Sequence, residues 1–214
     1  MPRILVTLFA ASLALAARPA TAQTTPTPPA TACDASSPDS PPGRAWWAAQ
    51  RWRYGDDAAA NAAYARLYKS ENPWPDWFTP ETPAQPGWND VTLPKPMHML
   101  PPIAALPVGM RFQMAIARGQ SPEAPGGWGT FDYIRSVEDV RNYLAVTWAF
   151  MNDPAQVVVY EIVRPLPAWI GPIGPQIDSA LCRYLPGGWS QINMMVKREE
   201  RMSYLRVIDV RDLQ

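Results

Sequence analysis

An arginine at the end of a predicted strand has a placement suited to binding chemistry. Residues 110–117 alternate well enough to predict a strand, and Arg118 and Gly119 follow it directly. The glycine leaves the guanidinium room to reach a ligand, and a guanidinium binds a diphosphate through two parallel hydrogen bonds. Arg118 is therefore a candidate phosphate-binding residue, and an ordinary surface arginine is the alternative interpretation.

The common catalytic motifs are absent from the sequence. The one histidine, His98, has no Gly-x-Ser-x-Gly motif to accompany it in a serine hydrolase, so we expect a structural role for it. Residues 126–129 (Gly-Gly-Trp-Gly) lack the spacing of a nucleotide-binding loop. Glu199 and Glu200 belong to the run Lys-Arg-Glu-Glu-Arg, which is typical of a solvated surface. One histidine and two cysteines give no obvious ligand set for a metal.

The net charge limits the classes of partner to expect, and the N-terminal residues indicate where the protein is located. The chain has 19 basic and 19 acidic residues, so it lacks the basic surplus that attracts nucleic acid or an anionic membrane surface. Residues 1–22 combine a basic start, an apolar run and an Ala-x-Ala site, which predicts a signal peptide. The apolar run is too short to span a bilayer. We therefore expect an exported protein, periplasmic or secreted, without membrane insertion.

The predicted export bears on the redox state of the two cysteines. Thiols that leave the cytoplasm meet an oxidising compartment, where pairs tend to close. The sequence therefore predicts a disulfide between Cys33 and Cys182, with two free thiols as the alternative.

The 26 prolines divide the chain, because each interior proline disfavours a helix. Residues 23–43 are rich in Thr, Pro and Ser and predict a linker. Residues 44–105 predict a helical stretch, 44–71, broken near Gly55, followed by a proline-rich segment that wraps the surface. Residues 106–214 predict an α+β domain.

The α+β domain is predicted from short apolar runs. Besides residues 110–117, strands are expected at 156–163, which is β-branched and therefore central, and at 190–196 and 203–210. Ser136 has the form of a helix cap, and the apolar residues after it predict a helix through Trp148.

Four motifs of the C-terminal half occur in an order shared with a known family. They are Leu-Pro-Val-Gly at 106–109, Val-Tyr-Glu-Ile-Val-Arg-Pro-Leu-Pro at 159–167, Gly-Pro-Ile-Gly-Pro at 171–175 and Leu-Pro-Gly-Gly-Trp-Ser-Gln at 185–191. Together they resemble the NAD glycohydrolases of the tuberculosis necrotizing toxin type, which carry Leu-Pro-Pro-Gly, Tyr-x-Val-x-Lys-Pro-Leu-Pro, Gly-Pro-x-Ala-Pro and Pro-Gly-x-Gly-Thr-Gln. The resemblance covers residues 106–212, about half of the chain.

The resemblance implies a fold and a reaction. The fold is an ADP-ribosyltransferase-like split mixed β-sheet with flanking helices, and NAD is the substrate in its cleft, with no permanently bound cofactor. Gln191 lies at the family's catalytic glutamine, where it would contact the nicotinamide ribose or orient the attacking water. Arg118 would hold the diphosphate, with Arg111 as a competitor for that role.

The resemblance also implies partners for the nicotinamide ring. Trp128, Phe131 or Trp189 would stack on it, because an aromatic face supports a flat cationic ring. An immunity protein or a target protein is left open as a macromolecular partner.

Two other functions stay open. Residues 176–178 (Gln-Ile-Asp) echo the Gln-x-Glu of protein ADP-ribosyltransferases, with Asp178 in place of the longer glutamate. A non-enzymatic exported binding domain on the same scaffold is the other alternative. The connection between the Gly-Pro motif and Gln191 is longer than in the family and includes Cys182, which would place the disulfide at the rim of the site.

Overall fold

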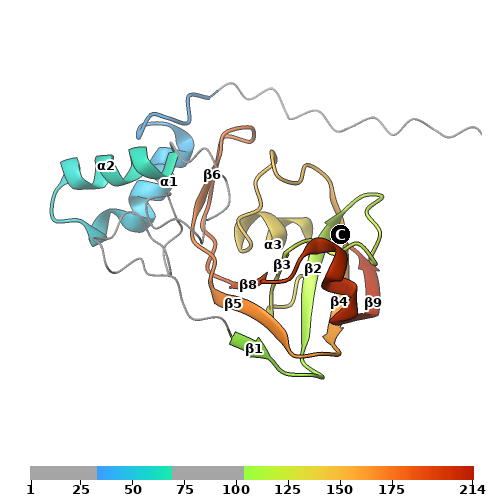
Figure 1. The fold of residues 1–214 in the computed structure, drawn as a ribbon. Coiled ribbons are helices and arrows are strands. Elements are labelled where there is room, and N and C mark those ends of the chain that lie inside the picture. The colour runs from blue at the N-terminus through green and yellow to red at the C-terminus, as the bar shows by residue number, and fades with distance from the viewer. Residues whose placement is uncertain (1–32, 69–103) are drawn as a thin grey trace, which may run out of the picture.

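The computed structural model describes residues 33–68 and 104–214. The predicted signal peptide, most of the predicted linker and the proline-rich stretch with His98 lie outside these residues. Helices form the N-terminal part of the described chain, and strands dominate the rest (Figure 1).

The N-terminal part consists of two helices and a short 3₁₀ turn: α1 (Pro41–Gln50), η1 (Arg51–Arg53) and α2 (Asp57–Tyr68). Helix α1 begins before the predicted start at Arg44, because the Ser40 hydroxyl caps it by accepting a hydrogen bond from the Gly43 N–H at 3.1 Å. The predicted break near Gly55 separates η1 from α2. The two helices share a cluster of buried side chains: Trp46, Ala63, Tyr64 and Leu67.

Two antiparallel sheets and a hairpin make up the C-terminal part. One sheet has the order β2-β4-β9, with bounds Arg111–Ala117, Pro154–Ile162 and Leu205–Asp212. The other has the order β1-β5-β8-β3, with bounds Ala104–Leu106, Leu166–Pro172, Ser190–Met194 and Trp128–Gly129. The hairpin pairs β6 (Gln176–Asp178) with β7 (Arg183–Leu185). Two short helical elements complete the C-terminal part: α3 (Val137–Asn142) and the 3₁₀ helix η2 (Arg198–Ser203). This mixture confirms the predicted α+β class.

The two sheets share one apolar core and are joined at one point. Val158, Tyr160 and Ile162 of the central strand β4 are buried in it, as the β-branched pattern of residues 156–163 predicted. Gln113 on β2 exchanges two backbone hydrogen bonds with Thr130, which follows β3, at 2.8 and 2.9 Å. This bridge fixes β3 beside β2.

The helix after Ser136 is shorter than the sequence predicts. The Ser136 hydroxyl accepts a hydrogen bond from the Asp139 N–H at 3.2 Å, so the predicted cap is confirmed. The helix ends at Asn142 instead of reaching Trp148, and Ala145 then takes a left-handed φ of 50°. Residues 143–153 therefore form a loop instead of the rest of a helix.

The predicted disulfide between Cys33 and Cys182 is present. Cys182 lies in the turn between β6 and β7, and the helices pack on this hairpin through contacts of Ile177 and Tyr184 with the cluster around Trp46. Figure 1 shows the hairpin projecting from the sheets toward α1 and α2.

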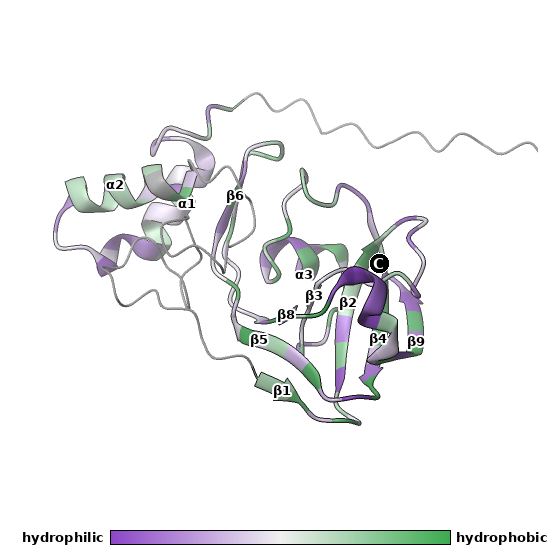
Figure 2. Cartoon of the chain, viewed as in Figure 1, coloured by the Kyte–Doolittle hydropathy of each residue, from purple (hydrophilic) through white to green (hydrophobic). Residues whose placement is uncertain are grey.

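Hydropathy follows this architecture. Figure 2 shows hydrophobic residues along the strands and a hydrophilic stretch at η2, close to the C-terminus. In residues 33–68 and 104–214, no helix is long and apolar enough to cross a membrane.

Candidate functional site

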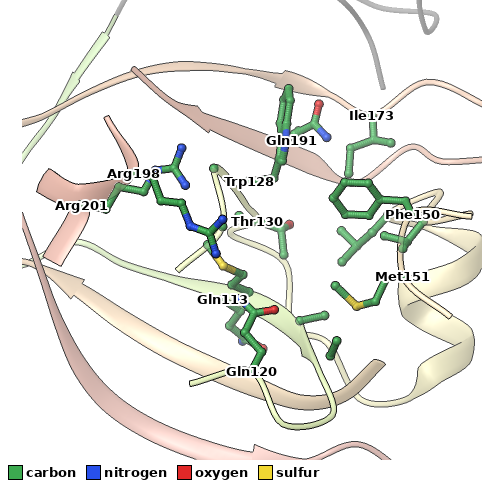
Figure 3. A pocket seen from close by; sticks show the side chains of 18 of the residues that line it. Gln113, Gln120, Trp128, Thr130, Phe150, Met151, Ile173, Gln191, Arg198 and Arg201 are labelled. Carbon is green, nitrogen blue, oxygen red and sulfur yellow. The ribbon is translucent and has the colours of Figure 1, made fainter. Parts of the chain in front are cut away.

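A pocket of about 530 Å³ opens beside β2 and β3 (Figure 3). Its walls come from these strands, from the loop 143–153 and from η2, and Gln191 of β8 adds a side chain. One part of the wall is apolar and is formed by Leu144, Val146, Phe150, Met151 and Ile173. The remaining side chains include amides, a hydroxyl, an indole and two guanidinium groups: Gln113, Gln120, Asn152, Gln191, Thr130, Trp128, Arg198 and Arg201. A pocket of this size and mixed lining suits a small organic ligand.

Gln191 is a buried wall residue with an unused acceptor. Its exposed fraction is 2%, and its backbone lies opposite Gly171 in the pairing of β8 with β5. The Oε1 atom is buried and has no hydrogen-bond partner among the described residues. A buried acceptor without a partner costs about 1–3 kcal/mol, so this atom is an unfavourable feature of the pocket wall as it stands.

Arg201 lines the pocket with a partly desolvated guanidinium. Its Nη1 donates to the Pro125 carbonyl at 3.1 Å, while its buried Nε has no partner among the described residues. Burial is the main cause that lowers its pKa, and the neighbouring charge of Arg198 lowers it further. The cation is therefore held in a place where an anion would stabilise it.

Arg198 adds a second cation to the same wall. Arg198 and Arg201 are three residues apart on a 3₁₀ helix, and this spacing places them on one side of it. Within residues 33–68 and 104–214, Arg198 has neither a hydrogen-bond nor an ion-pair partner, and no Asp or Glu lines the pocket. This end of the pocket therefore attracts anions.

The two arginines predicted to bind the diphosphate, Arg118 and Arg111, lie outside this pocket. Arg118 extends from the end of β2 into solvent, where its Nε donates to Asp153 Oδ2 at 2.7 Å, and this hydrogen bond raises its pKa. Arg111 lies at the other end of β2 and forms an ion pair with Glu161 at 2.9 Å. Neither arginine lines the pocket.

The three aromatic candidates are also separated. Trp128 lines the pocket on β3. Trp189 instead stacks on Tyr143, with ring centroids 4.9 Å apart, and Phe131 is partly exposed. Phe150, on the loop after α3, is a lining aromatic that the sequence analysis did not select.

Asp178, the transferase-like acid, holds local structure. Its Oδ2 accepts the Trp148 N–H at 2.7 Å, and its Oδ1 accepts the N–H groups of Ala180 and Leu181, both at 3.1 Å. The side chain is buried and does not line the pocket. Cys182 does not line it either, so the disulfide is not at its rim.

Arg198 and Arg201 were not predicted as site residues, because the charged run 197–201 is typical of a solvated surface. Glu199, Glu200 and Arg198 of this run are exposed, as expected, although Arg198 also lines the pocket, while Arg201 is half-buried in the pocket wall. The two arginines are three residues apart, and this spacing places them on one side of a 3₁₀ helix. The sequence alone does not show that the segment forms such a helix. Among the described residues, no cluster of His, Cys, Asp and Glu could hold a metal ion.

Comparisons with known proteins give a limited result. No family model matches the sequence, and no curated protein matches it. A solved structure of Tne2 in complex with Tni2 matches at a TM-score of 0.40 and 22% identity, over 52% of this chain and 90% of that chain. A TM-score this low does not carry the fold or the activity of that complex to this chain.

Proposed function

We propose that this chain is an exported NAD glycohydrolase that hydrolyses the nicotinamide N-glycosidic bond. The observation that carries the proposal is the position of Gln191, at the residue expected from the motif Pro-Gly-Gly-Trp-Ser-Gln, in the same pocket as Arg198 and Arg201. We propose further that the two antiparallel sheets form the ADP-ribosyltransferase-like split that the resemblance implies.

The lining supplies one partner for each chemical part of the dinucleotide. Arg198 and Arg201 provide the charge for the diphosphate, in place of Arg118, because guanidinium groups bind phosphate oxygens through paired hydrogen bonds. Trp128 provides an aromatic face for the cationic nicotinamide ring. The unpartnered Oε1 of Gln191 accepts a hydrogen bond from a ribose hydroxyl or from the attacking water.

The reaction needs a water molecule and no other co-reactant. The bond between the nicotinamide nitrogen and the ribose C1′ breaks, and the nitrogen keeps the electron pair, so nicotinamide leaves as a neutral molecule. Water adds to C1′ and releases one proton, which gives ADP-ribose. Positive charge develops on the ribose in the transition state, and an acceptor fixed beside it, such as Gln191 Oε1, stabilises that charge.

Export is part of the proposal. The disulfide between Cys33 and Cys182 supports it, because such bonds persist in oxidising compartments. An exported enzyme of this kind acts on extracellular dinucleotide, or as a toxin that enters another cell and is countered by an immunity protein.

The test is nicotinamide release from NAD by the purified, disulfide-bonded chain. We expect turnover by the wild type and none by Gln191→Ala, while Gln156→Ala, on β4 and outside the pocket, keeps full activity. Absence of both turnover and an NAD-dependent thermal shift in the wild type would overturn the proposal. Label transferred from a fluorescent NAD analogue to protein would instead support a transferase.

A further inference from the structure

One carboxylate organises the start of β8, next to Gln191. Asp132 Oδ2 accepts hydrogen bonds from the Ser190 N–H at 2.7 Å and from the Ser190 hydroxyl at 2.6 Å, and it lies 3.1 Å from the Thr130 hydroxyl. We call Asp132, Ser190 and Thr130 the Asp132 network. Of its members, Thr130 lines the pocket and Ser190 directly precedes Gln191.

Backbone pairing holds this end of β8 on one side only. On one side, β3 pairs with β8 only at Asn193 and Ile192, so its ladder ends before Gln191. On the other side, backbone hydrogen bonds continue past Ser190, because the Ile173 N–H donates to the Trp189 carbonyl at 2.8 Å and the Gly188 N–H donates to the Ile173 carbonyl at 2.7 Å. The Asp132 network takes the place of ladder hydrogen bonds on the β3 side, where the Ser190 N–H donates to Asp132 instead of to a strand.

Further hydrogen bonds tie the same point to the segment after β3. The Phe131 N–H donates to the Ser190 hydroxyl at 2.9 Å, and the Asp132 N–H donates to the Thr130 hydroxyl at 3.0 Å. The network therefore joins two pocket walls, the end of β3 and the start of β8, through side chains.

We propose that Asp132 is a positioning residue that fixes Gln191, through Ser190, in its place in the pocket wall. The expected effect of Asp132 on the reaction rate rests on the proposed NAD hydrolysis. Its expected effect on the local structure around Ser190 does not. A buried side chain must stay within a fraction of an ångström of its productive position, and misplacement by about 1 Å costs as much as about 100-fold in rate.

The experiment compares Asp132→Leu, Asp132→Asn and Ser190→Ala with Asp209→Asn, a matched control at an exposed aspartate of β9. We expect Asp132→Leu to lower kcat about 10–100-fold with KM nearly unchanged. Asp132→Asn keeps an acceptor oxygen and should retain much of the rate. Ser190→Ala, the milder change, loses the three hydroxyl contacts, to Asp132, Phe131 and Thr130, and should fall between them. Hydrogen exchange over residues 187–194 should accelerate in Asp132→Leu and stay unchanged in the control.

The two proposals fail in distinguishable ways. A wild type that does not cleave NAD removes the proposed function, and hydrogen exchange at Ser190 then decides the positioning role by itself. Unchanged exchange at Ser190 in Asp132→Leu overturns the inference. So does an active wild type whose Asp132→Leu variant exchanges faster but keeps its full kcat.

Discussion

The guanidinium of Arg201 lies against the backbone of Gly127: a β-carbon at Gly127 would stand 3.2 Å from Nη2 and 3.6 Å from the central guanidinium carbon. The first of these distances is tighter than an ordinary contact, so the glycine makes room for the cation in the pocket wall. The neighbouring Gly126 is different, because a β-carbon there would meet only Met114 Sδ at 3.6 Å, an ordinary van der Waals contact.

This difference makes Gly127→Ala a specific test of the cationic wall. The methyl group should shift the Arg201 guanidinium by a few tenths of an ångström, which weakens a charge-assisted hydrogen bond whose complete loss costs about 1.5–3 kcal/mol. We therefore expect ADP-ribose, measured by calorimetry, to bind more weakly, by up to about tenfold. Gly126→Ala is the matched control and should bind as the wild type does; equal affinity of both variants would contradict the role of Arg201.

The arginines of the pocket and of the surface should respond differently to removal of charge. We expect Arg201→Met and Arg198→Met to raise KM for NAD and to weaken its dependence on salt, because these cations face the ligand. Arg118→Met should leave both unchanged, since this exposed arginine pairs with Asp153. Steady-state kinetics at low and at moderate salt measures KM for NAD and its salt dependence in each variant. Loss of activity in Arg118→Met alone would return the phosphate role to Arg118.

Local patterns were sufficient to predict much of the fold. The β-branched run around Val158 predicted the central strand, and Ser136 predicted a helix start. Strand β5 escaped prediction because it contains Pro167 and Pro172, which disfavour an interior strand. The predicted extent of α3 was wrong because apolar residues at helical spacing also suit a buried loop. The left-handed conformation of Ala145, which follows the end of the helix, is not indicated by the local sequence.

The candidate site was predictable only where a motif marked it. Gln191 and Trp128, two of the residues selected from the sequence, line the pocket, and their roles in it stay predictions. Arg201 could not be assigned, because its position depends on Gly127 and Pro125, residues far from it in sequence, and on the folding of residues 198–203 into a 3₁₀ helix. Tertiary contacts of this kind are absent from any local pattern.

The ion pair between Glu138 of α3 and Arg183 of β7 should give stability a shallow pH dependence. The hydrogen bond from Arg183 is the main cause that lowers the pKa of Glu138 from its ordinary value of 4.5. A carboxyl whose pKa is lower in the folded state stabilises the fold above its unfolded pKa, and this contribution is lost as pH falls through the folded pKa. Because both side chains are partly exposed, the contribution is below about 1 kcal/mol.

We therefore expect Glu138→Gln to lower the free energy of unfolding slightly at pH 7, and the difference from the wild type to shrink as the pH falls toward 3. Chemical denaturation at the two pH values measures this difference. Glu123→Gln, at an exposed residue whose side chain has no ion pair among the described residues, is the control and should show no difference at either pH. A difference that grows toward acid would have the wrong sign for this ion pair.

Removal of the disulfide should loosen the helices more than the pocket. The bond joins residues 149 apart in the sequence, and loop closure of this length corresponds to about 4–5 kcal/mol in the chain-entropy model. The helices otherwise meet the rest of the described chain mainly through the hairpin contacts of Ile177 and Tyr184. The hairpin turn itself keeps its hydrogen bonds from Ala180 and Leu181 to Asp178.

The double variant Cys33→Ser, Cys182→Ser should therefore unfold at a lower temperature and expose residues 33–68 to proteolysis. Because neither cysteine lines the pocket, nicotinamide release at a temperature well below unfolding should match that of the wild type. Limited proteolysis followed by mass spectrometry locates the first cuts. First cuts within residues 143–153 would instead mean that the disulfide stabilises the pocket wall, through the Asp178 hydrogen bond to Trp148.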